Sequence, residues 1–141
     1  MTMTPERNRP AAPGNDQGRD TDVLLLSTIS NEMVQAQKNS FGRGPTQAKS
    51  YLLDDFLLVV MRHGATTAEG TAIELGRQDL AREFRLGIQE VLADRLIPRL
   101  QELTGRRIVN HRSQVLFAPH IVVEIFFFEQ PGAEGGAATE A

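Results

Sequence analysis

A glycine-rich segment with two nearby cations is the part of the sequence best suited to binding chemistry. Residues 41–46 read Phe-Gly-Arg-Gly-Pro-Thr, and a lysine follows three positions later. Glycines allow backbone N–H groups to converge on an anion, and the two cations add positive charge. The segment therefore predicts an anion or ligand site made of Gly42, Arg43, Gly44, Thr46 and Lys49.

This segment differs from the known phosphate-binding loops. It lacks the Gly-Lys-Ser/Thr ending of a P-loop, and it follows a predicted helix instead of opening one. It does not follow a strand, as a dinucleotide fingerprint does. The alternative interpretation, which the pattern favours, is a helix end and a turn into a strand, with Arg43 exposed.

Other residues that could do chemistry are few. Asp54 and Asp55 could hold a metal or act in acid–base catalysis, although adjacent acids in a turn are more often simply solvated. His63, His111 and His120 lack the helical spacing of a zinc pair, so they could share a site only through the fold. The chain has no cysteine, which excludes thiolate chemistry. We predict no catalytic residues, no metal site and no cofactor, and hence a non-enzymatic protein.

The charge balance bears on the class of partner. The 141 residues include 15 Lys and Arg against 18 Asp and Glu, a net charge of -3. Arg106, Arg107 and Arg112 form a local basic patch, but the acidic total argues against nucleic-acid binding. The sequence shows no secretory signal, and its apolar runs are too short to span a membrane. We expect a cytoplasmic protein without direct membrane insertion.

Composition divides the chain into two tails and one domain. Residues 1–21 and 131–141 are rich in small and polar residues, and both are predicted to be disordered. The ordered domain is then 22–130. Its first helix is predicted from Asp22 to Ser40, with Gly42 as its terminator.

Two hairpins are predicted from runs of β-branched, aromatic and other apolar residues. The first joins strands 48–53 and 56–61. The second joins strands 107–117 and 121–129 through the turn at residues 118–120. The turn of the first hairpin, Asp54-Asp55, lacks the favoured glycine, so its type is left open.

A long helical region is predicted between the hairpins. Thr66 and Glu69 fit a capping box at its start, and it ends near Thr104. Gly76 predicts a short helix followed by a long one, and Pro98 should kink the long helix or be tolerated at a kink. The apolar stripe of this region comprises Ile73, Leu80, Phe84, Ile88, Val91, Leu92, Leu100 and Leu103.

The element order αββαββ predicts an α+β fold with a four-stranded, mainly antiparallel sheet packed by the two helices. The last strand, residues 121–128, is apolar at almost every position, which is typical of a strand buried on both faces. Two helices cannot easily cover both faces of four strands. We therefore predict a homodimer, with the second sheet face or the long helix at the interface.

Six spaced motifs remain to be considered together. They are residues 29–33, 41–46, 51–55, 75–80, 82–85 and 103–106. Together they resemble the MpsC family of Na⁺-translocating, membrane-potential-generating systems. The resemblance implies a small cytosolic component associated with membrane proteins that move cations and, in related systems, take up inorganic carbon. It implies no known active site.

Two functional hypotheses follow. The first is an accessory or regulatory subunit that binds a membrane transporter subunit, at or near the inner face of the membrane. The second is a small-anion or nucleotide sensor that uses the Gly42–Thr46 loop.

Overall fold

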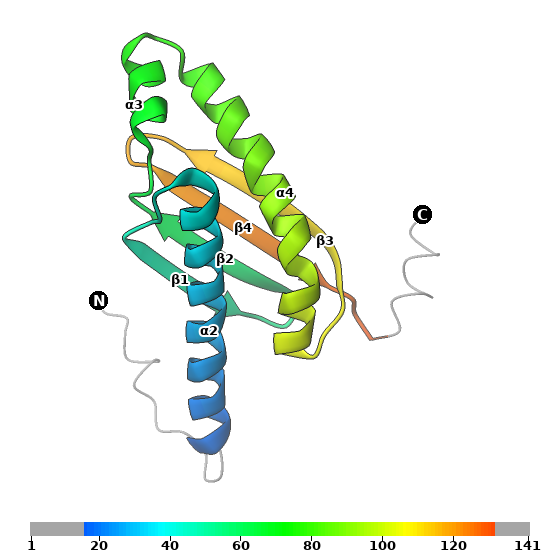
Figure 1. The fold of residues 1–141 in the computed structure, drawn as a ribbon. Coiled ribbons are helices and arrows are strands. Elements are labelled where there is room, and N and C mark those ends of the chain that lie inside the picture. The colour runs from blue at the N-terminus through cyan, green and yellow to red at the C-terminus, as the bar shows by residue number, and fades with distance from the viewer. Residues whose placement is uncertain (1–15, 132–141) are drawn as a thin grey trace, which may run out of the picture.

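The computed structural model describes residues 16–131, which form three helices and four strands (Figure 1). The predicted α+β class is confirmed, and the long helical region is divided in two, as Gly76 suggested. In chain order the elements are α2 (Asp16–Phe41), β1 (Gln47–Leu52), β2 (Phe56–Arg62), α3 (Thr67–Glu74), α4 (Gln78–Thr104), β3 (Ile108–Leu116) and β4 (Ile121–Phe128).

The four strands form one antiparallel sheet in the order β1-β2-β4-β3. Each hairpin supplies two neighbours, and the hairpins meet where β2 pairs with β4. In that central pairing Val59 lies opposite Glu124. Strand β4 therefore has a hydrogen-bonded neighbour on each side, which suits its β-branched and aromatic sequence.

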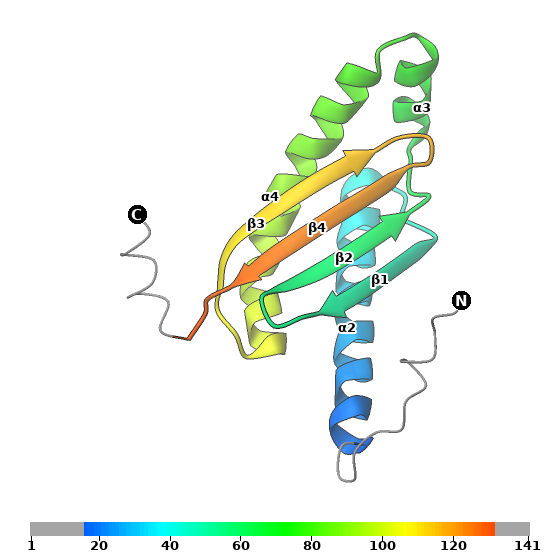
Figure 2. The same cartoon turned by 180° about the vertical axis from the view of Figure 1, so that it is seen from behind.

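Helices α2 and α4 lie on one face of the sheet (Figures 1 and 2). Apolar side chains from α2, α4, β2, β3 and β4 fill the core between these layers. Its buried members include Ile29, Met33, Leu57, Val59, Met61, Leu100, Val115, Val122, Phe126 and Phe128.

The other face of the sheet carries no helix of the described residues (Figure 2). We call it the open face, and strand alternation assigns its side chains. Its two central strands are apolar, whereas most of its polar and cationic residues lie on the edge strands. The open face comprises Gln47, Lys49 and Tyr51 of β1, Phe56, Leu58, Val60 and Arg62 of β2, Asn110, Arg112, Gln114 and Leu116 of β3, and Ile121, Val123, Ile125 and Phe127 of β4.

Helix α2 begins at Asp16, earlier than the predicted start at Asp22. Residues 16–21 contain no large apolar side chain, so hydrophobic periodicity could not mark them as helical. Apart from residues 16–21 and 131, the predicted tails at 1–21 and 131–141 lie outside the described residues.

The start of α3 has the predicted capping box. The Thr66 hydroxyl accepts from the Glu69 N–H at 3.1 Å, and the Glu69 carboxylate accepts from the Thr66 N–H at 2.8 Å. Gly76, with a φ of 80°, lies in the turn between α3 and α4. Helix α4 then continues through Pro98 to Thr104.

The residues that α4 buries differ from those of the predicted apolar stripe. Arg85 and Gln89 are buried toward the sheet. Leu80, Phe84 and Val91 point outward instead and are 48%, 57% and 47% exposed. The stripe was wrong for these three residues, because polar groups from other elements meet Arg85 and Gln89 in the interior.

Candidate functional site

The predicted glycine-rich segment joins α2 to β1. Gly42 has a φ of 77°, and its N–H donates to the Lys38 carbonyl at 2.9 Å, which closes the end of α2. The Thr46 N–H donates to the Arg62 carbonyl at 3.0 Å, next to the first strand pair. A Cβ at Gly44 would lie 3.4 Å from Val34 Cγ1, an ordinary van der Waals distance, so this segment passes close to α2. The helix end accounts for Gly42 without a ligand.

The five predicted ligand residues do not line one pocket. Thr46 and Lys49 line an open pocket of about 470 Å³ at one side of the open face, together with Arg62. The Lys49 ammonium also lies 5.4 Å from the centre of the Tyr51 ring. Arg43 is exposed and is not among the residues that line this pocket. An anion site made of all five residues stays a prediction. The second cationic side chain in the pocket that contains Lys49 is Arg62, which is not one of the five.

A buried ion pair joins α3 to α4. Arg85 and Glu69 are 1% and 2% exposed. The Arg85 guanidinium donates two hydrogen bonds to the Glu69 carboxylate, at 2.6 and 2.9 Å, in the two-pronged geometry that favours this pair. Burial alone would raise the pKa of Glu69, but its hydrogen bonds with Arg85, His120 and the Thr66 N–H hold that pKa well below its ordinary value.

The same guanidinium contacts other parts of the chain. It donates to the Gly64 carbonyl at 2.8 Å and to Gln37 Oε1 at 3.2 Å. Its carbon lies 3.7 Å from the centre of the Phe41 ring, a cation–π contact. Arg85 therefore connects α2, α3, α4 and the segment after β2.

Hydrogen bonds continue from Arg85 to a second buried acid, Glu124 of β4. Gln89 accepts from Arg85 at 3.4 Å and donates to Glu124 Oε2 at 2.7 Å, and Ser113 Oγ donates to Glu124 Oε1 at 2.5 Å. Burial raises the pKa of Glu124 to about 7. The bonds from Ser113 and Gln89 oppose that rise, and the negative charge of Glu90 adds to it.

We call this connected set the Arg85 network. It holds one fixed ion pair and one acid that titrates near neutrality, and it runs from the α3 end of the domain into the middle of the sheet. Two of its buried nitrogens, Gln37 Nε2 and His120 Nδ1, have no hydrogen-bond partner among residues 16–131. Its members are Gln37, Glu69, Arg85, Gln89, Ser113, His120 and Glu124.

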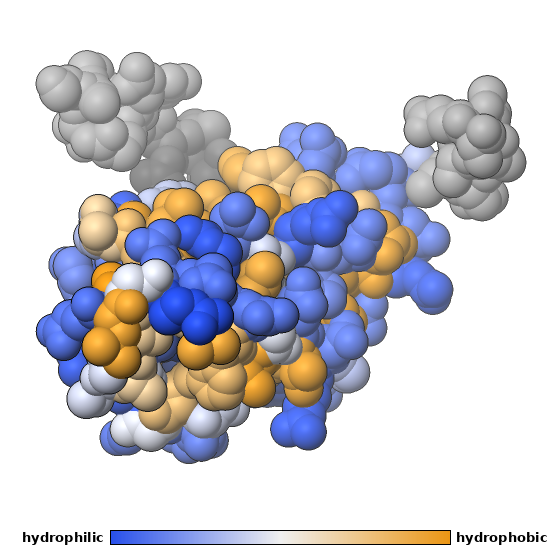
Figure 3. Space-filling view, turned by 90° about the horizontal axis from the view of Figure 1, so that it is seen from above, coloured by the Kyte–Doolittle hydropathy of each residue, from blue (hydrophilic) through white to orange (hydrophobic). Residues whose placement is uncertain are grey.

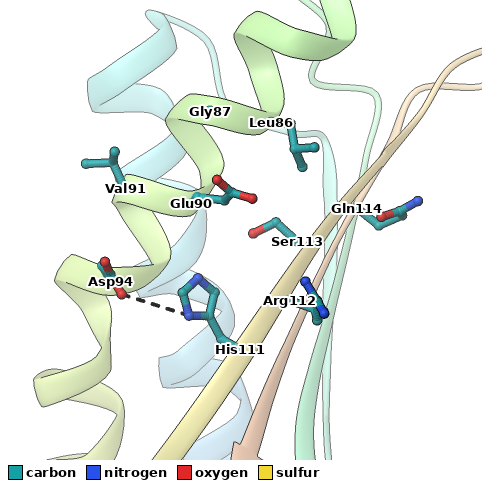
Figure 4. A pocket seen from close by; sticks show the side chains of 9 residues that line it. All are labelled: Leu86, Gly87, Glu90, Val91, Asp94, His111, Arg112, Ser113 and Gln114. Carbon is teal, nitrogen blue, oxygen red and sulfur yellow. Dashed lines mark ion pairs between the residues drawn. The ribbon is translucent and has the colours of Figure 1, made fainter.

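A pocket of about 620 Å³ lies beside the network, between α4 and β3 (Figure 4). Glu90, His111 and Ser113 point into it, whereas Arg112 and Gln114 lie on the far side of the strand. His111 Nδ1 is 3.9 Å from Asp94 Oδ1 at the rim. Since Ser113 donates to Glu124, it separates the buried acid from the pocket.

The predicted acids and histidines are not brought together. Asp54 and Asp55 lie in the β1–β2 turn, at the opposite end of β2 from His63. The His63 N–H donates to the His120 carbonyl at 3.1 Å, but His111 lies further along the sheet, against Phe126. Between residues 16 and 131 no three acid or histidine side chains are placed to hold a metal ion.

The Arg85 network was missed at the level of sequence, yet two signals point to it. Arg85 and Gln89 are four residues apart, on the same helical face as Ala81 and Leu92. Glu124 interrupts an otherwise apolar strand, so its side chain had to enter a buried layer. An acid on a strand and an arginine on a helix, each placed among apolar neighbours, indicate buried polar partners.

The whole domain was compared with known proteins. The family model described as "Na+-translocating membrane potential-generating system (MpsC)" matches residues 21–130. The chain belongs to the MpsC family. No curated protein and no solved structure matches it.

The MpsC match includes all four strands, α3, α4 and most of α2, and therefore the entire Arg85 network. It confirms the resemblance inferred from the spaced motifs. The family description links the chain to a membrane system that moves Na⁺. Within residues 16–131 of this MpsC protein, no helix is both long and apolar enough to cross a bilayer.

Proposed function

We propose that this MpsC-family protein is a non-enzymatic accessory or regulatory subunit, which binds a membrane cation-transport protein through the open face of its sheet. The observation that carries the proposal is the apolar centre of that face, which no helix of the described residues covers (Figure 2). The family description supplies the membrane system.

The composition of the open face supports a protein partner. The outward side chains of β2 and β4 are mainly aliphatic or aromatic, and Phe56 packs edge-on against Phe127 across the strand pair. Burying such surface is favourable by about 25 cal/mol per Å². Lys49, Arg62 and Arg112 flank the apolar centre, and the face as described contains no acid. A partner with an apolar stripe and acidic flanks fits this surface.

The alternative anion sensor has weaker support. Two of the N–H groups of the Gly42–Thr46 loop already donate to backbone carbonyls, and Arg43 does not line the pocket that contains Lys49. The non-enzymatic part of the proposal is supported by the separation of Asp54 and Asp55 from the histidines. We place the protein in the cytoplasm, at the inner face of the membrane when it is bound.

The proposal is tested by capture from detergent-solubilised membranes of the source cells, with bound proteins identified by mass spectrometry. The unchanged protein should retain a multi-spanning cation transporter. Leu58→Lys places a charge in the centre of the open face and should abolish retention. Leu75→Lys is the matched control, because Leu75 is 74% exposed and lies beyond the sheet, after α3.

Two results would refute the proposal. One is that the retained membrane proteins include no cation transporter. The other is that Leu58→Lys retains the transporter as well as the unchanged protein does, while circular dichroism shows both to be folded.

A further inference from the structure

The outward side of α4 carries an apolar seam that the fold covers only in part. Phe84 packs edge-on against Phe41 of α2, with ring centres 6.3 Å apart, and Leu80 and Phe84 border a hollow beside α3. Leu80, Phe84 and Val91 are about half exposed, and Gly87 lies between them. Figure 3 views the molecule from the end where α3 meets α4, and apolar residues reach the surface there among hydrophilic ones. With Arg77 and Asp94 at its ends, the seam follows alternating spacings of three and four residues, the repeat that pairs one helix with another.

Gly87 is unexplained by packing within the chain. Glycine is the poorest helix former apart from proline, yet Gly87 occupies the interior of α4. A Cβ built at Gly87 would meet no atom within 4 Å, so nothing in the described chain requires a glycine. Val91 borders the α4–β3 pocket together with Gly87, and in Figure 4 its side chain lies on the side of α4 away from β3. A glycine on such a surface permits the close approach of another helix.

We infer that α4 pairs with α4 of a second copy, antiparallel, about a twofold axis between Phe84 and Gly87. In this register Phe84 of one protomer lies over Gly87 of the other, so the largest side chain of the seam meets the smallest. Leu80 then packs against Val91, and both apolar contacts occur twice because the axis repeats them.

The charges at the two ends of the seam fit the same register. Arg77 of one protomer comes opposite Asp94 of the other. The side chains of Arg77 and Asp94 are largely exposed, so both can reach across to the other protomer. Within one protomer Arg77 pairs with Asp79, and Asp94 lies 3.9 Å from His111. A parallel pairing would place Arg77 on Arg77 and Asp94 on Asp94, which is repulsive. The second copy is therefore favoured over an unrelated partner by size and by charge.

Cysteine cross-linking tests the register directly, because the chain contains no cysteine of its own. Phe84→Cys and Gly87→Cys are prepared separately, one with a mass tag, then mixed and oxidised. Disulfide-linked heterodimer should form, and Leu80→Cys with Val91→Cys should behave likewise. The control mixture is Phe84→Cys with Val109→Cys, since Val109 is 55% exposed on β3 and away from the seam. Equal yields in the control and the test mixtures would overturn the inference, as would preferential Leu80–Leu80 linkage.

Sedimentation equilibrium gives a second readout that does not depend on cysteine. The unchanged protein should dimerise as its concentration rises. Gly87→Leu should remain monomeric while its melting temperature is unchanged or higher, because a Cβ at this position meets open space in the monomer and leucine is a better helix former than glycine. Gly70→Leu is the matched control, a helix glycine of α3 that also has open space around it. A monomeric unchanged protein, or an unaffected dimer in Gly87→Leu, would contradict the seam.

Charge exchange separates this register from other helix pairings. Arg77→Asp and Asp94→Arg should each weaken dimerisation by a few-fold, the size expected for exposed ion pairs. The double variant should restore it, because each protomer again offers opposite charges to its partner. Additive weakening in the double variant would rule out the proposed contact.

Discussion

The carboxyl group of Glu124 is fully buried and accepts hydrogen bonds from Ser113 and Gln89. Its pKa is raised from 4.5 to about 7, and burial is the largest cause. A group whose folded pKa is raised stabilises the protein fully below the unfolded pKa, and that stability is lost as the pH rises through the folded pKa. The window for Glu124 therefore runs from about pH 4.5 to about pH 7.

Glu124→Gln removes this titration while it keeps the shape of the side chain. The free energy of unfolding of Glu124→Gln, relative to the unchanged protein, should increase by roughly 3 kcal/mol between pH 4.5 and pH 8, the value expected for this pKa difference. Urea unfolding at several pH values measures it. Since Glu69 is present in both proteins, its own titration cancels. Glu83→Gln, on the outward side of α4, should show no such trend, and a flat profile for Glu124→Gln would disprove the assignment.

At the scale of elements, Arg85 connects three helices and the segment after β2. Arg85→Met should lower the free energy of unfolding by about 3–5 kcal/mol, because it leaves the Glu69 carboxylate buried without its cation. Urea unfolding at neutral pH measures this loss. Arg99→Met is the control, since its contacts with Glu32 and Glu102 are solvent-exposed and should matter little.

A second substitution shows whether the buried charge is responsible. Glu69→Gln in the Arg85→Met background removes the unpaired carboxylate but keeps an oxygen for the capping box of α3. The double variant should therefore be more stable than Arg85→Met alone. If it is less stable, the loss in Arg85→Met comes mainly from contacts with Gln37, Gly64 and Phe41.

The elements themselves were largely predictable from local chemistry. Both hairpins, the capping box at Thr66 and the helix end at Gly42 follow from residues that are close in the sequence. The orientation of α4 did not, because Arg85 and Gln89 resemble a solvated face until Glu69 and Glu124 are brought to them from other elements. The predicted apolar stripe therefore placed Leu80, Phe84 and Val91 on the buried side of the helix.

For the candidate site too, local features could be predicted from the sequence and tertiary contacts could not. The sequence drew attention to the Gly42–Thr46 loop, because glycines and cations there are adjacent in the chain. The Arg85 network is assembled from α2, α3, α4, β3, β4 and the turn before β4, so its members are related only by the tertiary fold. Local patterns therefore proposed a binding segment of adjacent residues and missed the long-range polar cluster.

At the scale of the whole molecule, the two proposed surfaces lie on opposite sides. The seam is on the outward side of α4, and the open face is on the side of the sheet away from the helices (Figures 1 and 2). A dimer built through the seam would leave both open faces directed outward. Each dimer could then hold two copies of a membrane partner, and the two proposals make a joint prediction.

Gly87→Leu should abolish the clustering of membrane vesicles that carry the partner, although it leaves the open face unchanged. Because the two open faces of the dimer point in opposite directions, one dimer can join two vesicles, whereas a monomer with one open face cannot. The turbidity of a vesicle suspension measures clustering. It should rise with the unchanged protein and with Gly70→Leu and stay at the baseline with Gly87→Leu, which should still co-sediment with the vesicles. Loss of vesicle binding in Gly87→Leu would mean that the seam contacts the membrane partner itself, and the separation of the two surfaces would be wrong.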